Sequence, residues 1–192
     1  MTKPLRSQPT RDNILEAARR LFGEEGYDRT TIRSIAAAAG IHPSMVMRYY
    51  GSKEALFAAA ATFDLELPDL SRVAKRDLGR TLVRHFLTRW EANTGELPAL
   101  LRVSVTHAQA RSRLIEIFRQ QVAPAIADIC GKERAAVCSA LLATQTLGLA
   151  LTRYVLRLPS VVSLPDDVIV DRIGATIQAY LFEDGSGSSK SF

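Results

Sequence analysis

Cysteine is nearly absent from the 192-residue sequence, which contains only Cys130 and Cys138. Two cysteines eight residues apart exclude a disulfide-stabilised scaffold and the paired C-x-x-C ligands of a structural zinc site. We expect reduced, partly buried thiols in a cytosolic protein rather than a redox switch.

Glycine and proline are not enriched, with 11 and 8 residues, and no stretch alternates apolar and polar residues between hairpin turns. Apolar residues instead recur at spacings of three and four along almost the whole chain, which predicts an all-α fold. The composition, 47% hydrophobic and 23% charged, is that of an ordinary soluble globular protein. The polar opening of the chain predicts no signal peptide.

One long uncharged run is present, from Ala135 to Thr152, at the lower limit of a membrane-spanning length. Serine, threonine and glutamine side chains interrupt it, and Arg134 and Arg153 close it on both sides. We therefore expect a helix covered by protein rather than a membrane span.

Positive charge is concentrated in the first quarter of the chain, although the net charge is only +5. Residues 1–53 hold nine basic and five acidic side chains, whereas residues 54–192 hold sixteen and fifteen. This distribution favours a polyanionic partner for the N-terminal region.

The periodicity and the capping signals predict the following helices. The first follows Thr10 as a candidate N-cap and ends at Gly26, the second starts at Thr30 or Thr31 and ends at Gly40. Pro43 opens a third that runs to about Tyr50. Further helices are expected at 52–61, 71–93, 96–108, 111–130, 132–158 and 166–182, with breaks at 93–95, 109–112, 131 and 159–165. Helices 132–158 and 166–182 form an antiparallel hairpin, and two such hairpins would build a homodimer as a four-helix bundle.

Residues 31–50, TIRSIAAAAGIHPSMVMRYY, have the pattern of a helix, a short turn with glycine and a second helix. This pattern is typical of a helix-turn-helix, whose second helix enters the major groove of DNA. Val46 and Tyr50 are expected to pack on Ile35 and Leu21. The outward side chains would then be Ser44, Met45, Arg48 and Tyr49, which suit base edges and phosphates.

The longer segment TTIRSIAAAAGIHPSMVMRYYGSKEALFAA resembles the signature of the TetR family of transcriptional regulators, and the resemblance extends over residues 10–61. It implies a homodimeric one-component regulator, usually a repressor, with an all-helical C-terminal domain that binds a small molecule. Positions that match the family's phosphate contacts are Thr31, Tyr49 and Lys53. Positions that match its groove-facing residues are His42, Pro43, Ser44, Met45 and Arg48. The family often has serine or threonine at position 42 and an aromatic residue at position 47, so operator preference does not transfer from relatives.

Each of these positions also has a structural interpretation. Thr31 can be a helix cap as well as a phosphate ligand, because a capping hydroxyl lies beside the amides that attract phosphate. Arg48 suits a bidentate guanine contact and a phosphate contact equally. The remaining alternatives are a half-buried ring for Tyr49, a solvated charge for Lys53, a cap or solvated imidazole for His42, and a disordered tail rather than a minor-groove arm for Arg6 and Arg11.

Catalytic and metal-binding motifs are missing. The sequence has no H-E-x-x-H, G-x-S-x-G, Walker or G-x-G-x-x-G pattern, and its histidines, His42, His85 and His107, fall on three different predicted helices. We therefore predict no enzyme activity, no cofactor and no metal site. Candidates for an apolar ligand pocket are Phe86, Trp90, His107, Phe118 and Gln145. A core aromatic pair is the alternative for Phe86 and Trp90, and Gln145 faces either a ligand or the dimer interface.

The sequence thus predicts a helix-turn-helix DNA-binding domain at 1–53, a ligand-binding and dimerisation domain at 54–184, and a flexible tail at 185–192. The expected partners are double-stranded DNA with a palindromic operator, an unknown small-molecule effector and a second copy of the chain. The expected location is the cytoplasm, without membrane attachment. Two other classes remain open: an all-helical small-molecule binder or enzyme that uses the first helices as scaffold, and an architectural DNA protein.

Overall fold

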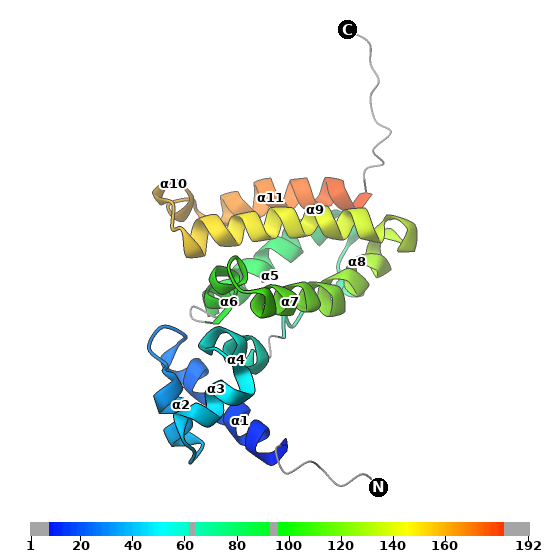
Figure 1. Cartoon of the computed structure of the whole chain (residues 1–192). Coiled ribbons are helices and arrows are strands. Elements are labelled where there is room, and N and C mark those ends of the chain that lie inside the picture. Colours follow the sequence, from blue (N-terminus) through cyan, green and yellow to red (C-terminus); the bar gives the residue numbers. More distant parts are fainter. Residues whose placement is uncertain (1–7, 62–63, 93–95, 183–192) are drawn as a thin grey trace, which may run out of the picture. The chain divides into compact units, whose positions relative to one another are not determined.

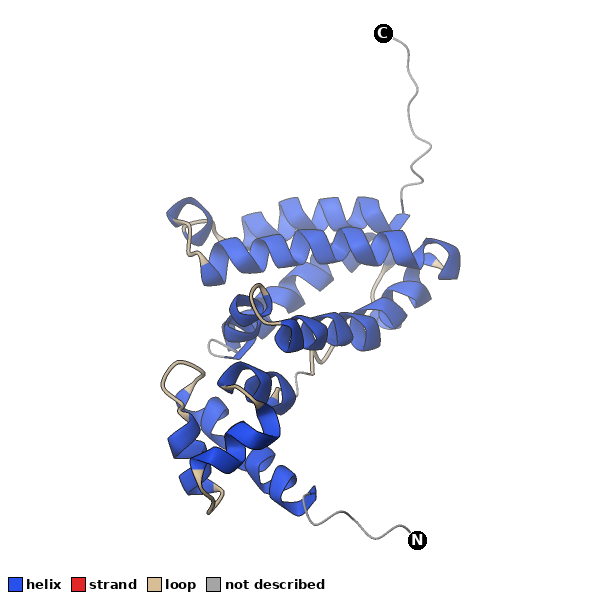
Figure 2. Cartoon of the chain, in the orientation of Figure 1, coloured by secondary structure: helices blue, strands red, loops and turns tan. Residues whose placement is uncertain are grey.

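The computed structural model describes residues 8–61, 64–92 and 96–182, and within these ranges every regular element is a helix (Figure 1, Figure 2). The all-α prediction is therefore confirmed. Contacts divide the chain into an N-terminal unit, Met1–Phe63 with Asn93–Glu116, and a C-terminal unit, Asp64–Ala92 with Ile117–Phe192. The chain passes from one unit to the other after residues 63, 92 and 116.

The N-terminal unit begins with one long helix, α1 (Gln8–Glu25), and three short ones, α2 (Ile32–Ala38), α3 (Pro43–Tyr50) and α4 (Lys53–Ala60). Their core contains four apolar residues of α1, Ile14, Ala18, Leu21 and Phe22, together with Ile35, Val46, Leu56 and Phe57. Thr10 lies inside α1 and is not its N-cap. Thr30 does not cap α2: it is buried, and its hydroxyl donates to the carbonyl oxygens of Leu21 (3.0 Å) and Gly26 (2.8 Å).

Two further helices, α6 (Glu96–Ser104) and α7 (Ala108–Ile117), return to this unit, apart from the last residue of α7. Arg102 of α6 pairs with Asp28 in the turn after α1, with 3.2 Å between Nη1 and Oδ2. Arg113 of α7 donates from Nε to the carbonyl oxygen of Ala61 at 2.8 Å. Packing thus groups α4, α6 and nearly all of α7 with the first three helices. The functional boundary expected after Lys53 remains a prediction.

The C-terminal unit begins with two short 3-10 turns, η1 (Leu70–Arg72) and η2 (Lys75–Asp77), and continues with α5 (Leu78–Ala92). It then contains the π-helical turn η3 (Phe118–Val122), α8 (Ala123–Cys130), α9 (Lys132–Ala150), the π-helical turn η4 (Leu151–Val155), α10 (Pro159–Val162) and α11 (Asp166–Phe182). Helices α5, α9 and α11 pack on one another around Val83, Leu142, Ile177 and Leu181 (Figure 1). Both cysteines are free, with Cys138 buried and Cys130 half-buried.

Glycine allows α5 and α11 to approach closely. A Cβ atom on Gly79 would collide with the carbonyl oxygen of Gly174, and the Gly79 amide donates to Oε1 of Gln178 at 2.9 Å. Backbone contact of this kind requires a residue without a side chain.

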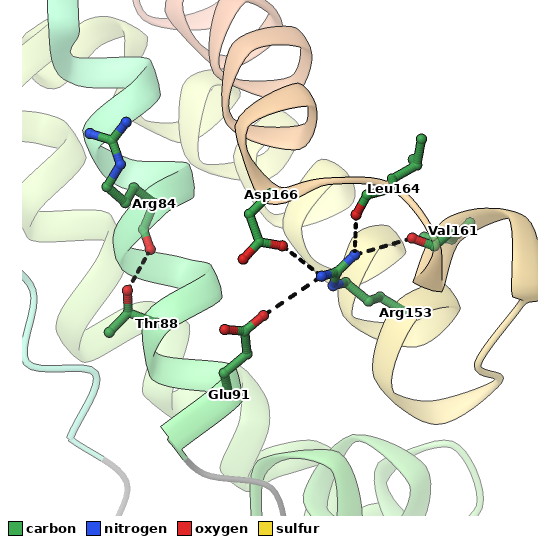
Figure 3. Close-up of polar contacts among 7 residues, drawn as sticks. All are labelled: Arg84, Thr88, Glu91, Arg153, Val161, Leu164 and Asp166. Carbon is green, nitrogen blue, oxygen red and sulfur yellow. Dashed lines mark hydrogen bonds and ion pairs between the residues drawn. The ribbon is translucent and has the colours of Figure 1, made fainter.

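Arg153 in η4 connects four elements of this unit (Figure 3). Its side chain is only 12% exposed, and Nη2 lies 2.6 Å from Oδ1 of Asp166 and 3.7 Å from Oε1 of Glu91. Nη1 donates to the carbonyl oxygens of Val161 (3.1 Å) and Leu164 (3.2 Å). The guanidinium thereby holds the turn around α10 between α5 and the start of α11.

Several predicted helix boundaries are wrong. The helix expected at 71–93 starts at Leu78, because Asp69 caps a separate 3-10 turn through the Ser71 amide. The break expected at 109–112 lies at 105–107, where the Val103 carbonyl accepts from the amides of both Thr106 and His107. The helix expected at 132–158 changes to a π-helical turn after Ala150, and α10 forms inside the break expected at 159–165.

Among the described residues, the helix Lys132–Val155 has the length and hydropathy that a membrane span would need. Its most apolar window has a mean hydropathy of 1.5, and 22% of that window is buried within the chain. Much of this apolar surface is therefore uncovered in the single chain.

Candidate nucleic-acid interface

The turn into α2 is closed by reciprocal hydrogen bonds. Thr31 is the N-cap: its hydroxyl accepts from the Ser34 amide at 3.0 Å, and the Ser34 hydroxyl accepts from the Thr31 amide at 2.9 Å. Thr31 is exposed, so its hydroxyl stands at the start of a helix, where free amides favour an anion. The capping role predicted for Thr31 is confirmed, and the phosphate contact remains a prediction.

The second helix of the motif, α3, begins as expected with Pro43 at its first position. Its N-cap is His42, whose Nδ1 accepts from the Ser44 amide at 3.3 Å and lies 2.8 Å from the Ser44 hydroxyl. An Nδ1 that accepts from the amide carries no hydrogen, so in the neutral ring the hydrogen is on Nε2. The structural interpretation of His42 as a cap is confirmed.

The faces of α3 separate buried from exposed residues. Val46 is fully buried, whereas Ser44 and Arg48 are exposed and Met45 and Tyr49 are half-buried. The Arg48 guanidinium lies 5.9 Å from the centre of the Tyr49 ring. A charged planar donor, a hydroxyl and a phenol thus share the outer surface of a short helix.

Tyr50 differs from its expected place in the core. It is half-buried, and its hydroxyl donates to the carbonyl oxygen of Arg11 at 3.1 Å. The Arg11 guanidinium lies 5.6 Å above the Tyr50 ring. Tyr50 therefore ties the end of α3 to the start of α1, because its hydroxyl needs a partner that the apolar core lacks.

Lys53 stands at the start of α4, behind the N-cap Ser52, whose hydroxyl accepts from the Ala55 amide at 3.0 Å. The Lys53 ammonium lies 4.3 Å from the centre of the Tyr27 ring and 3.5 Å from the carbonyl oxygen of Asp28. The side chain is half-buried against an aromatic face rather than freely solvated.

Sequence reasoning missed a polar cluster beside Lys53. The Tyr27 hydroxyl donates to Oε1 of Glu54 at 2.9 Å, and burial together with that bond raises the pKa of Tyr27 well above its ordinary value. Burial pushes the pKa of Glu54 upward, but hydrogen bonds from its own amide, Tyr27 and Ser52 and the charge of His107 lower it overall. Glu54 therefore stays ionised at neutral pH. The only signal in the sequence is an acidic residue in the first turn of α4.

The five predicted pocket residues are divided between the two units, and their assignment to a ligand pocket remains a prediction. His107 belongs to the N-terminal unit, where Nε2 lies 3.9 Å from Oε2 of Glu54. The Phe86 and Trp90 rings pack at 5.4 Å, and Trp90 stacks on Tyr154 at 5.3 Å. Phe118 and Gln145 are half-buried in the C-terminal unit.

The C-terminal unit holds an open cleft of about 500 Å³ between η1, η2, α8 and the end of α11. Its lining includes Leu70, Lys75, Asp128, Ile129 and Phe182, and the Lys75 ammonium lies 4.5 Å from the Phe182 ring centre. None of the five predicted pocket residues lines this cleft.

Comparison with known proteins gives consistent matches for both parts of the chain. Residues 14–60 match the family model "Bacterial regulatory proteins, tetR family", and residues 77–181 match the model "Tetracyclin repressor-like, C-terminal domain". A crystal structure of a TetR-family regulator from Streptomyces coelicolor A3 is 32% identical, with a TM-score of 0.56, over 94% of this chain and 99% of that chain.

Two curated relatives match over the N-terminal part. The HTH-type transcriptional repressor Rv1474c of Mycobacterium tuberculosis is 39% identical over 67 residues, 35% of this chain and 35% of that protein. The HTH-type transcriptional repressor AcnR of Corynebacterium efficiens is 42% identical over 62 residues, 32% of this chain and 31% of that protein. Each match thus spans about a third of the length of the curated relative.

Proposed function

Because the chain belongs to the tetracycline-repressor family of bacterial regulatory proteins, we propose that it is a homodimeric transcriptional repressor. It binds a palindromic operator in the cytoplasm and releases it when a small-molecule effector binds. In this proposal residues 1–53 contact the DNA, and residues 54–184 carry the effector site and the dimer contacts. The chain is a regulator and not an enzyme.

The observation that carries the proposal is the outer surface of α3, where exposed Ser44 and Arg48 stand opposite fully buried Val46. Placed in the major groove, this surface brings Arg48 to base edges, and the half-buried Tyr49 and Lys53 to the adjacent backbone. The proposed DNA contacts are Thr31, His42, Pro43, Ser44, Met45, Arg48, Tyr49 and Lys53.

The proposed dimer contact is an uncharged face of α9. Its exposed residues recur at helical spacing and include two large apolar side chains, Val137 at 63% and Leu141 at 39% exposure. The exposed residues of this face are Ala136, Val137, Ala140, Leu141, Thr144 and Gly148. A second copy of α9 and α11 covers this face in a four-helix bundle. The two copies of α3 must then stand about 34–36 Å apart to reach successive major grooves.

Release by an effector follows from linkage between two dimer states. A ligand that binds more tightly to a dimer with another separation of the α3 helices lowers DNA affinity by that difference in affinity. The cleft of about 500 Å³ has the size of a small-molecule site. A second candidate region is the aromatic stack of Phe86, Trp90 and Tyr154.

The decisive experiment is selection of random duplex DNA by the purified protein at about 150 mM salt, where nonspecific binding is weak. Enrichment of an inverted repeat supports the proposal and supplies a probe for effectors. A confirmed dimer that enriches no sequence would overturn it and favour a helical protein that uses α1–α3 only as scaffold.

A further inference from the structure

The ammonium of Lys53 is held in place before any DNA arrives. Its Nζ lies 4.3 Å from the centre of the Tyr27 ring and 3.5 Å from the carbonyl oxygen of Asp28. A lysine side chain otherwise loses rotamer freedom when it contacts a phosphate, and that loss weakens binding. A fixed ring beneath the ammonium reduces the loss.

The Tyr27 ring is itself fixed on several sides. It stacks on Phe22 at 5.9 Å and packs against Phe57 at 4.8 Å between ring centres. Its hydroxyl donates to Oε1 of Glu54 at 2.9 Å. The aromatic contacts set the depth of the ring, and the hydrogen bond sets its position relative to the start of α4.

Glu54 is a costly residue at this position for a protein that binds DNA. Its carboxylate follows Lys53 directly in the chain and is 26% exposed, so it repels a phosphate that approaches Lys53. Electrostatics alone therefore predicts that removal of this charge strengthens DNA binding. If Glu54 instead positions Lys53, its removal should weaken DNA binding.

Residues of α6 and of the corner before α7 contact Glu54, which binds the Tyr27 hydroxyl, and Asp28, whose carbonyl oxygen faces Lys53. His107 lies 3.9 Å from Oε2 of Glu54, and its Nδ1 is 2.9 Å from the Thr106 hydroxyl. Arg102 pairs with the carboxylate of Asp28 at 3.2 Å, and the carbonyl oxygen of the same residue faces Lys53. All of these residues belong to the N-terminal unit.

We propose that Glu54 is a positioning residue for DNA binding: through Tyr27 it fixes the aromatic platform under Lys53, and His107 holds Glu54 in place. The inference rests on the proposed phosphate contact of Lys53. It assigns the α6–α7 corner a part in DNA affinity without any contact between that corner and DNA.

The test measures the affinity of full-length variants for the selected duplex and for an unrelated duplex of equal length. Tyr27→Phe keeps the ring and the net charge, whereas Glu54→Met removes the negative charge together with the acceptor of the Tyr27 hydroxyl. We expect both variants to weaken binding to either duplex roughly two- to tenfold, because the Lys53 side chain must then be ordered when DNA binds. Glu24→Met is the matched control, because this carboxylate lies on α1 in an exposed pair with Arg20; its removal leaves binding unchanged or strengthens it.

A cycle with Lys53→Met separates positioning from a general structural effect. If Tyr27 acts through Lys53, Tyr27→Phe has no further effect in the Lys53→Met background. Full additivity, or unchanged or tighter binding by Tyr27→Phe and Glu54→Met, would overturn the inference while leaving the Lys53 contact intact. Unchanged binding by Lys53→Met would overturn the proposed contact itself and the inference with it.

Discussion

The carbonyl oxygen of Gly174 occupies the space that a side chain on Gly79 would need. Helices α5 and α11 therefore meet backbone to backbone, and their close approach depends on two residues without side chains. Neither glycine lies at a turn, so their role is packing.

Gly79→Ala should destabilise the protein by about 1–3 kcal/mol, because a backbone must move to admit one methyl group. The measurement is the free energy of unfolding in denaturant. Arg84→Ala, on the exposed side of the same helix, is the control and should change it by less than about 0.5 kcal/mol. Equal stability of the two variants would contradict the close crossing.

Arg153→Met should cost about 1–3 kcal/mol, because two backbone carbonyls and two carboxylates lose a largely buried donor. Hydrogen exchange should also rise around α10. Arg80→Met removes an arginine whose pair with Asp171 is 53% exposed on both sides, and should cost at most about 1 kcal/mol. If Arg80→Met proves the more damaging variant, Arg153 does not hold the α10 turn.

Leu141→Glu should dissociate the proposed dimer, because it places a charge in the uncharged face of α9. Analytical ultracentrifugation at a series of concentrations measures the change. Ile115→Glu makes the same substitution on α7 at a residue that is 59% exposed, and should leave the dimer intact. A Leu141→Glu protein that remains dimeric would place the dimer contact elsewhere.

Arg48→Ala should relax sequence preference at one position of each half-site, because it removes the proposed base contact. Lys53→Ala should weaken binding to all sequences alike and reduce the salt slope by about one, the signature of a phosphate contact. Affinities for the selected duplex and its single-base variants, at several salt concentrations, measure both effects. Equal losses for both variants on every sequence would rule out base contact by Arg48.

The features that sequence predicted well depend on neighbours in the chain. Thr31 and Pro43 mark helix starts through their own backbone and hydroxyl chemistry, and Val46 follows from helical spacing. The resemblance to the TetR family rested on the same short segment.

The features that sequence missed depend on residues far apart in the chain. His107 was assigned to a ligand pocket from its type and position, but its neighbour Glu54 lies more than fifty residues away. Phe86 and Trp90 form an aromatic pair whose composition is the same in a core or a pocket, so spacing could not distinguish the two. The contact between Lys53 and Tyr27 could not be predicted either, because Tyr27 lies in the turn after α1, far from Lys53 in the sequence.

The three passages of the chain between its units restrict how such a regulator can be recombined. A chimera joined once, at residue 63, would carry α1–α4 but leave behind Arg102, His107 and Arg113, which contact Asp28, Glu54 and Ala61. Exchange of operator specificity between relatives by a single crossover would therefore mismatch these contacts. A working hybrid has to bring residues 93–116 with the DNA-binding helices, or change only the outer face of α3.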